Sequence, residues 1–367
     1  MKIIILIFFL ITFLGLVVVA NVYLARRFAR YFRRSVKYLY VIFALFAVFM
    51  IAGVAAFTNS SGIVGNFFYI IAASTMGILL YLLLAVLFVD LLHFIIKVKP
   101  AFYGIAAISL ALIFSVYGVW NSYKLITTQI TIPIKGITKQ VRAMHVSDVH
   151  LGHFRGKALL QKIVDETKKQ NVDIVFITGD LFDSKYNINM DVISPLKQLE
   201  MPIYFVEGNH DVYSGIKTIK NNLRKTGVIV LENEVTHWGE LQIIGLNYMI
   251  ADEDAVSMHT ADQGITIKSV MSSLNVEKDI PVILLHHSPD GIKYANEAEV
   301  DLFLAGHTHA GQTFPFNYVT ELLYQFNRGF YNYKGTKVFV SEGIGTVGPP
   351  MRVATKSEII VLTLIPE

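Results

Sequence analysis

Four long apolar stretches constrain the fold of this chain more than any other feature. A helix needs about 20 apolar residues to cross the roughly 30 Å hydrocarbon core of a bilayer. Four stretches without a formal charge reach this length, at residues 3–23, 38–57, 67–89 and 101–120. The sequence therefore predicts an all-α bundle of four transmembrane helices in residues 1–124, and hence a multi-pass protein of the cell membrane.

The charged residues divide the chain at the same place. Residues 1–124 contain ten Lys or Arg and a single acid, Asp90, whereas the remaining residues contain 22 Lys or Arg and 27 Asp or Glu. The basic excess of the whole chain comes from the membrane part, so it does not indicate a nucleic-acid partner. We expect a linker or first strand at 125–140 and a second domain over 141–367.

The short loops between the predicted spans indicate a topology. Six positive charges lie between Arg26 and Lys37, whereas the loop at 58–66 carries no charge. Positively charged short loops remain in the cytoplasm, so we expect the chain after Trp120 to lie outside it. Alternatively, residues 1–20 are a cleaved signal peptide. A small-residue cleavage site is not evident there, and an uncleaved span is preferred.

The second part of the chain alternates short β-rich runs with amphipathic helical stretches. Runs such as 172–178 and 280–285 are continuous in Val, Ile, Leu and Phe, which is typical of strands covered on both faces. Helical periodicity appears between them, for example at 157–170 and 216–225. This alternation predicts an α/β architecture with two or more layers.

Five of the predicted strands end in clusters of Asp, Asn or His. The clusters are Ser-Asp-Val-His (147–150), Gly-Asp (179–180), Gly-Asn-His-Asp (208–211), His-His-Ser-Pro (286–289) and Gly-His-Thr-His (306–309). In open α/β sheets, ligands bind beyond the carboxyl ends of the strands. We therefore expect these side chains to converge. The glycine before Asp180, Asn209 and His307 is expected to let the backbone turn tightly.

Carboxylate, amide and imidazole donors in this number suit two divalent metal ions. Such a pair lowers the pKa of a bound water from 15.7 toward ~7 and stabilises charge on phosphoryl oxygens. Hard oxygen and imidazole ligands are compatible with Mn, Fe, Zn or Co, and the sequence does not select among them. The chain has no cysteine, which excludes thiolate zinc sites and Cys nucleophiles.

These motifs, in this order, resemble the calcineurin-like metallophosphoesterase superfamily. The stretches 306–312 and 343–352 resemble its bacterial membrane-associated branch. The resemblance implies a four-layer αββα sandwich and two metal ions that share one carboxylate, Asp180. It also implies three further ligands for each ion: Asp148, His150 and His309 for one, and Asn209, His287 and His307 for the other.

The resemblance further implies two catalytic residues that are not metal ligands. His210 would contact the phosphoryl group or protonate the leaving oxygen, and Asp183 would orient it. A carboxylate partner raises the pKa of an imidazole and fixes its tautomer, so the pairing is chemically reasonable. We expect Asp211 and Asp290 to orient loops or to cap helices.

Three other histidines have competing interpretations. Neighbouring residues of a strand point to opposite faces, so only one of His286 and His287 can be a ligand, and the His-X-Pro register selects His287. His145 lies inside its strand and is expected to be a hydrogen-bonded core residue. His153 is either a residue bordering the substrate or an ordinary loop residue.

The segment 313–331 is rich in aromatic residues and directly follows the last expected ligand. It is either a hydrophobic cap over the sheet or a lip that enters the bilayer surface or holds an acyl chain.

The expected function is that of a membrane-anchored, metal-dependent phosphoesterase. It would hydrolyse a phosphomono- or phosphodiester by metal-activated hydroxide, on a lipid-linked or cell-envelope substrate outside the cytoplasm. One alternative is a cytoplasm-facing nucleotide-lipid pyrophosphatase. Another is an inactive sensor or scaffold, although all seven expected ligands are present. The sequence indicates no particular oligomeric state.

Overall fold

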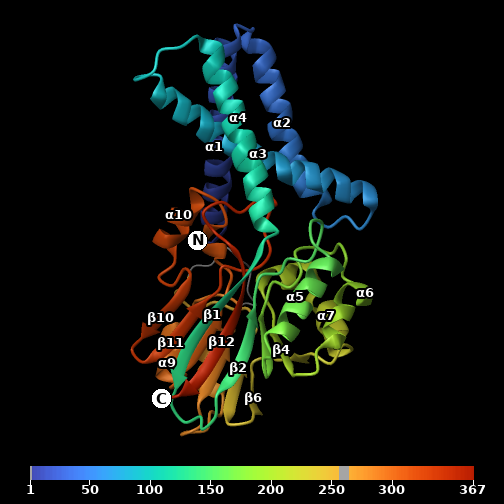
Figure 1. Cartoon of the computed structure of the whole chain (residues 1–367), viewed down its shortest axis with the longest axis vertical. Helices are drawn as coiled ribbons and strands as arrows, with labels where there is room; N and C mark the ends of the chain where they lie inside the picture. Colours follow the sequence, from blue (N-terminus) through green and yellow to red (C-terminus); the bar gives the residue numbers. More distant parts are fainter. Residues whose placement is uncertain (1, 256–263) are drawn as a thin grey trace. The chain divides into compact units, whose positions relative to one another are not determined.

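The computed structural model describes residues 2–255 and 264–367 (Figure 1). The chain forms two compact units. The first comprises the residues up to Asn121 together with Gly348–Met351, and the second comprises Ser122–Val347 and Arg352–Glu367.

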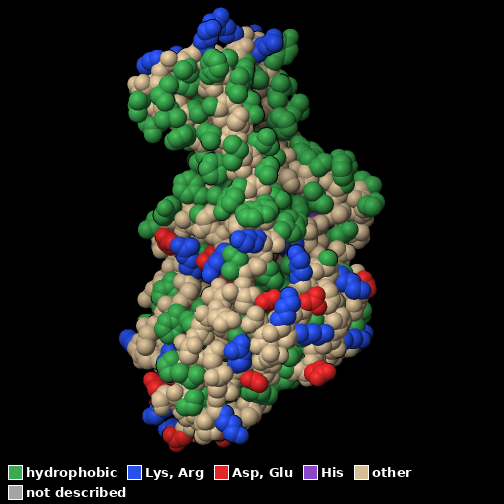
Figure 2. Space-filling view, in the orientation of Figure 1, with side chains coloured by type: hydrophobic (Ala, Val, Ile, Leu, Met, Phe, Trp, Pro, Cys, Tyr) green, Lys and Arg blue, Asp and Glu red, His purple; other side chains and the backbone are tan. Residues whose placement is uncertain are grey.

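The first unit is helical, with one helix for each predicted span. The helices are α1 (Lys2–Phe32), α2 (Val36–Phe57), α3 (Ile63–Leu92) and α4 (Pro100–Ser122). All four are long and apolar enough to cross a membrane. Large apolar side chains cover their outer surface (Figure 2), for example Leu45, which is 64% exposed. A helix that is apolar all round suits a lipid environment.

Helix α1 extends beyond the predicted span and includes part of the basic loop. Arg26, Arg27 and Arg30 lie within the helix rather than in a connection. Arg27 Nε is 2.5 Å from a carboxylate oxygen of Asp90 in α3, and the hydroxyl of Tyr31 donates to the other oxygen at 2.6 Å. Arginine is a good helix former, and this pairing gives the charged end of the helix a partner.

The second unit contains two six-stranded sheets. The strand order of the first is β1 (Leu125–Ile134), β12 (Ser357–Pro366), β2 (Val141–Val146), β3 (Ile174–Thr178), β4 (Ile203–Val206) and β5 (Ile229–Val230). The order of the second is β10 (Gly329–Tyr333), β11 (Thr336–Val340), β9 (Leu302–Ala305), β8 (Val282–Leu285), β7 (Leu241–Gly245) and β6 (Glu234–Trp238).

The central strands of each sheet run parallel, so their carboxyl ends meet at one edge. In the first sheet β2, β3, β4 and β5 pair in parallel. In the second, β7, β8, β9 and β11 do so. Strand β1, in the segment predicted as a linker or first strand, pairs in parallel with β12.

Helices cover the outer face of each sheet, and apolar side chains fill the three interfaces. Helices α5 (Lys157–Lys169), α6 (Met190–Ile193) and α7 (Asn209–Arg224) accompany the first sheet. Helices α8 (Ile267–Ser273) and α9 (Ile292–Glu297) accompany the second. A third apolar cluster lies between the sheets. The four-layer αββα architecture is thereby confirmed.

Strand β3 shows why the sequence reads as a continuous apolar run. Ile174 and Phe176 pack into the cluster between the sheets, whereas Val175 and Ile177 pack under the helices. Successive side chains of a strand point to opposite faces, and both faces of this strand are buried. The segment before β4 is less regular: it forms the short α6 and a 3-10 helix (Ser194–Gln198) with a proline near its start.

Candidate metal centre

The five motif loops follow strands of both sheets and converge at the carboxyl edge. Asp148 follows β2, Asp180 follows β3 and Asn209 follows β4, all from the first sheet. His287 follows β8 and His307 follows β9, both from the second sheet. The site therefore lies where the edges of the two sheets come together.

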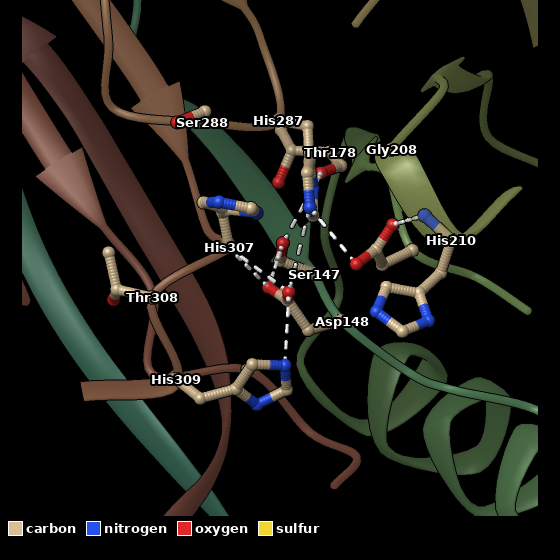
Figure 3. Close-up of polar contacts among 12 residues, drawn as sticks. Ser147, Asp148, Thr178, Gly208, His210, His287, Ser288, His307, Thr308 and His309 are labelled. Atoms are coloured by element: carbon tan, nitrogen blue, oxygen red, sulfur yellow. Dashed lines mark hydrogen bonds and ion pairs between the residues drawn. The ribbon is translucent and has the colours of Figure 1, made fainter. Parts of the chain in front are cut away.

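One group of donors consists of Asp148, His150 and His309. Their ligand atoms lie within 4.8 Å of one another, and all three residues are buried. The Nε2 atoms of His150 and His309 are 3.0 Å apart. His309 Nε2 is 3.4 Å from Oδ1 of Asp148, and Figure 3 shows the His309 ring directed at this carboxylate.

A second group consists of Asp180, His287 and His307, again with ligand atoms within 4.8 Å of one another. Nε2 of His287 lies 3.1 Å from Oδ2 of Asp180. The same Asp180 oxygen is 3.8 Å from Nε2 of His150 in the first group. Asp180 thus lies between the two groups, the position that a shared carboxylate requires.

Two buried atoms of these ligands indicate that the site is built for cations. Oδ1 of Asn209 and Nε2 of His287 find no hydrogen-bond partner among the described residues. A buried polar atom left unsatisfied costs about 1–3 kcal/mol. Both atoms are ordinary metal ligands, so bound divalent ions would satisfy them. The residues present therefore fit the two ions that the motifs imply.

Hydrogen bonds from surrounding groups fix the orientation of the donors. Nδ1 of His287 lies 2.8 Å from the carbonyl oxygen of Thr178 and donates to it, which leaves Nε2 free to bind a metal. Ser147 Oγ donates to Oδ2 of Asp148 at 2.5 Å. The backbone N–H of His210 donates to Oδ1 of Asp180 at 2.8 Å, so its other oxygen can face the centre.

The backbone at most of the expected ligands is in the left-handed region. Residues other than glycine adopt this conformation at a cost of about 1–3 kcal/mol each, and they cluster at functional sites. Positive φ angles of 49–74° occur at five of the seven expected ligands: Asp148, His150, Asp180, His307 and His309. The surrounding sheets must hold these loops against that strain.

The three glycines before the ligands serve two different purposes. Gly179 has φ of +83°, so it provides the tight turn that the sequence predicts before Asp180. Gly208 and Gly306 do not have a positive φ. They are needed for close approach instead. A Cβ on Gly306 would lie 2.0 Å from Ser147 Oγ and 2.1 Å from Oδ2 of Asp148.

His210 and Asp183 form a pair beside the first group of donors. Nδ1 of His210 and Nδ1 of His150 lie 3.1 and 3.2 Å from the same Asp183 oxygen. Burial alone would lower the pKa of His210, but the carboxylates of Asp180 and Asp183 outweigh it and raise the pKa to about 10. Burial opposes ionisation of Asp183, yet contacts to His150 and His210 hold its pKa far below the usual range.

The remaining histidines with competing interpretations are placed as follows. His286 is buried with Nδ1 2.7 Å from the carbonyl oxygen of Ser288, and burial lowers its pKa to about 4. His145 is buried with Nε2 2.8 Å from Thr178 Oγ1, as expected for a core residue. His153 is buried and its ring stacks on Tyr186, with centroids 4.7 Å apart.

Asp211 orients the loops around the centre, as the sequence predicts. Its carboxylate accepts hydrogen bonds from the backbone N–H groups of Phe182, Gly208 and Leu181 at 2.9, 3.1 and 3.3 Å. These donors belong to the loops that carry Asp180 and Asn209, so a single carboxylate ties two ligand loops together.

Arg352 is a residue of the site to which sequence reasoning assigned no role. It is fully buried. Its Nη2 lies 3.0 Å from Nδ1 of His309 and donates to the carbonyl oxygen of Glu342 at 2.7 Å. Its Nε donates to the carbonyl oxygen of Gly345 at 3.0 Å. Burial lowers the pKa of Arg352 to about 10. The sequence signal for Arg352 is that it is the single charged residue in the glycine- and proline-rich stretch 343–352.

A cleft of about 510 Å³ adjoins the second group of donors and reaches His307. Its lining is largely aromatic and includes Tyr248 and Tyr324. Polar groups are present as well, among them Asp290, and Leu323 forms part of the wall. The volume lies within the range of small-molecule sites, so the cleft can hold an organic group attached to a phosphate at the centre.

Replacing Gly306 with alanine should weaken metal binding. The new Cβ would displace the Asp148 carboxylate, and disturbing the support of a ligand typically lowers metal affinity about 10- to 100-fold. Titration calorimetry of Mn²⁺ into the metal-stripped full chain measures this. Gly156→Ala is the matched control, because its Cβ would meet nothing closer than 3.8 Å. Equal affinities of the two variants would contradict the argument.

Comparisons with known proteins agree with this geometry. Residues 141–311 match the family model of the calcineurin-like phosphoesterases. An uncharacterised metallophosphoesterase of Helicobacter pylori is 33% identical over 235 residues, covering 63% of this chain and 61% of the relative. A transmembrane protein with a metallophosphoesterase domain from Danio rerio is 29% identical over 282 residues, covering 71% and 62%. The chain thus spans less than two thirds of the length of these relatives.

For a third relative, the alignment covers almost the whole length of the relative. An uncharacterised metallophosphoesterase of Aquifex aeolicus is 29% identical over 266 residues, covering 70% of this chain and 97% of the relative. The family match begins at β2 and ends just after His309, so it includes all seven expected ligands. Residues 141–311 thus match the calcineurin-like phosphoesterases, and four candidate transmembrane helices precede them.

Proposed function

We propose that this protein is a membrane-anchored, metal-dependent phosphoesterase that hydrolyses a phosphomono- or phosphodiester by direct displacement. The position of Asp180 between two groups of buried donors carries the proposal. Two divalent ions, when bound, would lower the pKa of a water and stabilise charge on the phosphoryl oxygens. The donors are compatible with Mn, Fe, Zn or Co.

The side chains around the ions would bind them, orient the ligands and keep bulk water away. Asp148, His150 and His309 would hold one ion, and Asn209, His287 and His307 the other, with Asp180 shared. His287 is oriented by the hydrogen bond that its Nδ1–H donates to the Thr178 carbonyl oxygen, and Asp148 by the one that it accepts from Ser147 Oγ. Six of the seven residues are buried, and His307 is partly exposed. Burial keeps bulk water away from the ligands, which strengthens their interaction with charge.

His210 is proposed as the proton donor to the leaving oxygen. Its Nδ1 is held by Asp183 at 3.1 Å, so Nε2–H remains available to a phosphoryl or leaving oxygen. The raised pKa keeps the ring protonated at neutral pH. The side chain is 23% exposed, unlike the buried donors of the first group, so a substrate can reach it.

The substrate is proposed to be lipid-linked or part of the cell envelope, and the phosphoesterase domain to lie outside the cytoplasm. Membrane anchoring supports the first point, because it keeps the enzyme at the bilayer, where lipid-linked substrates are found. The basic residues at the end of α1 support the second, through the retention of positive segments in the cytoplasm. A cytoplasm-facing nucleotide-lipid pyrophosphatase is the alternative.

Replacing Asp180 with asparagine should abolish turnover while the protein stays folded. The amide cannot supply the negative charge that two adjacent dications need, so the metal content should fall below about two ions per chain. Elemental analysis, circular dichroism and phosphate-release assays on purified protein measure these effects. Asp165→Asn, at an exposed position in α5, should change none of them. Normal turnover by Asp180→Asn would refute the shared-carboxylate site, and a folded wild type that binds metal but hydrolyses no ester would favour the scaffold alternative.

The pH dependence of kcat should reveal the protonation of His210 and its control by Asp183. Activity requires protonated His210, so kcat should fall at alkaline pH as this residue loses its proton. The Asp183 anion raises the pKa of His210, so Asp183→Asn should move the alkaline limb to lower pH. Profiles of kcat for an alkyl phosphate ester measure the shift, with metal content checked in each variant. An unchanged limb in Asp183→Asn would exclude this role.

The compartment of the phosphoesterase domain can be tested with fused reporters. A reporter active only outside the cytoplasm should be active when fused after Glu367. The same reporter inserted after Arg34, in the basic turn that follows α1, should be inactive, because this segment is retained inside. Activity only at Arg34 would reverse the topology and favour the cytoplasm-facing alternative.

A further inference from the structure

The phosphoesterase unit exposes its apolar side chains unevenly. Among its described residues, twelve large apolar side chains are exposed, and six of these lie in one stretch of ten residues. They are Phe314 (41%), Phe316 (48%), Tyr318 (58%), Val319 (44%), Leu322 (88%) and Leu323 (69%). Contiguous exposed apolar surface marks an interaction site rather than ordinary protein surface.

Helix α10 (Phe316–Leu323) accounts for most of this surface, and its polarity is reversed. Phe316, Val319 and Leu323 have the three- and four-residue spacing of one helix face, and this face is exposed. The polar Asn317 is buried instead, at 6% exposure. A helix on a water-facing surface has the opposite pattern, with its apolar face toward the core. The outer face of α10 therefore suits an apolar surrounding.

The lipid bilayer is the apolar phase that this chain is built to contact. Four helices are apolar enough to span it. Only two residues separate the end of α4 at Ser122 from the start of β1 at Leu125. Two extended residues reach about 7 Å, so the phosphoesterase unit is tethered at the boundary of any bilayer that α4 crosses. Phenylalanine, leucine and tyrosine are the residues with which helices enter that boundary.

We propose that α10 is an interfacial helix whose apolar face lies in the headgroup region of the same bilayer. The inference deepens the proposed function, on which its substrate class rests. Leu323 belongs both to the exposed face and to the wall of the cleft that reaches His307. A phosphate ester of an amphiphile can then keep its chain in the bilayer while its polar part enters the cleft.

The cleft lining restricts that polar part. Tyr248, Tyr294 and Tyr324 offer aromatic faces. The carboxylates of Asp252 and Asp290 outnumber the single cation of the lining, Lys293, so a second anionic group beside the phosphate is disfavoured. Ser288 Oγ donates to one Asp290 oxygen at 2.5 Å. The lining thus favours a headgroup with hydroxyl or amine donors and an apolar face, rather than a second phosphate.

The absence of cysteine from the chain allows a direct test with single-cysteine variants. Leu322→Cys and Ile229→Cys are each labelled with an environment-sensitive fluorophore, and the full chain is reconstituted in phosphatidylcholine–phosphatidylglycerol vesicles. Nitroxide-labelled lipid should quench the probe at 322 about twofold, since an interfacial helix lies about 5–10 Å into the headgroup–acyl boundary. The probe at 229, where the isoleucine is 40% exposed on β5, should not be quenched.

The outcomes separate the two proposals. No quenching at 322, or a blue shift without quenching as when protein covers the helix, overturns the interfacial helix. Leu322→Glu should reduce hydrolysis of a phosphate ester of a vesicle-embedded lipid about tenfold, the contribution of one buried leucine. Its hydrolysis of soluble bis(p-nitrophenyl) phosphate should be unchanged. If the wild type hydrolyses neither ester, the proposed function fails, while the quenching result still decides the placement of α10.

Discussion

Buried lone-pair donors that face one another dominate this structure. His287 donates its Nδ1–H to the carbonyl oxygen of Thr178, so its Nε2 carries a lone pair when the ring is neutral. That lone pair faces the Asp180 carboxylate at 3.1 Å. Such pairs are unfavourable in a low dielectric unless a cation lies between them, and the surrounding loops are arranged to keep them together.

The sandwich supplies the rigidity that this arrangement needs. Five expected ligands have left-handed backbone conformations, and strained loops persist only where their surroundings determine them. The parallel strands of the two sheets are buried on both faces and anchor one end of each loop. Asp211 and Arg352 then connect loops to one another through backbone hydrogen bonds, so moving one ligand would disturb several others.

In the proposed function, the metal centre and the membrane helices serve one reaction, the hydrolysis of a lipid-linked phosphate ester. Metal-assisted hydrolysis needs a buried, preorganised set of donors, whereas a lipid-linked ester must be reached at a bilayer surface. The cleft beside His307 and the outward apolar face of α10 share Leu323. With α10 placed as proposed, an amphiphilic substrate would extend from the bilayer through the cleft to the metal centre.

The sequence by itself determined the four apolar spans, the α/β alternation and the convergence of the motif loops, because hydropathy and strand-end clusters are local patterns. The four αββα layers were expected only from the family resemblance. Strand alternation predicted that only one of His286 and His287 is a ligand, and the His-X-Pro register favoured His287. Only the tertiary structure showed that Arg352 contacts His309 across 43 residues, and that Gly306 is required by Asp148 rather than by a turn. It also showed that α1 continues to Phe32, where Arg27 meets Asp90, and that α10 faces outward. These features depend on which distant groups become neighbours, and a local pattern does not contain that information.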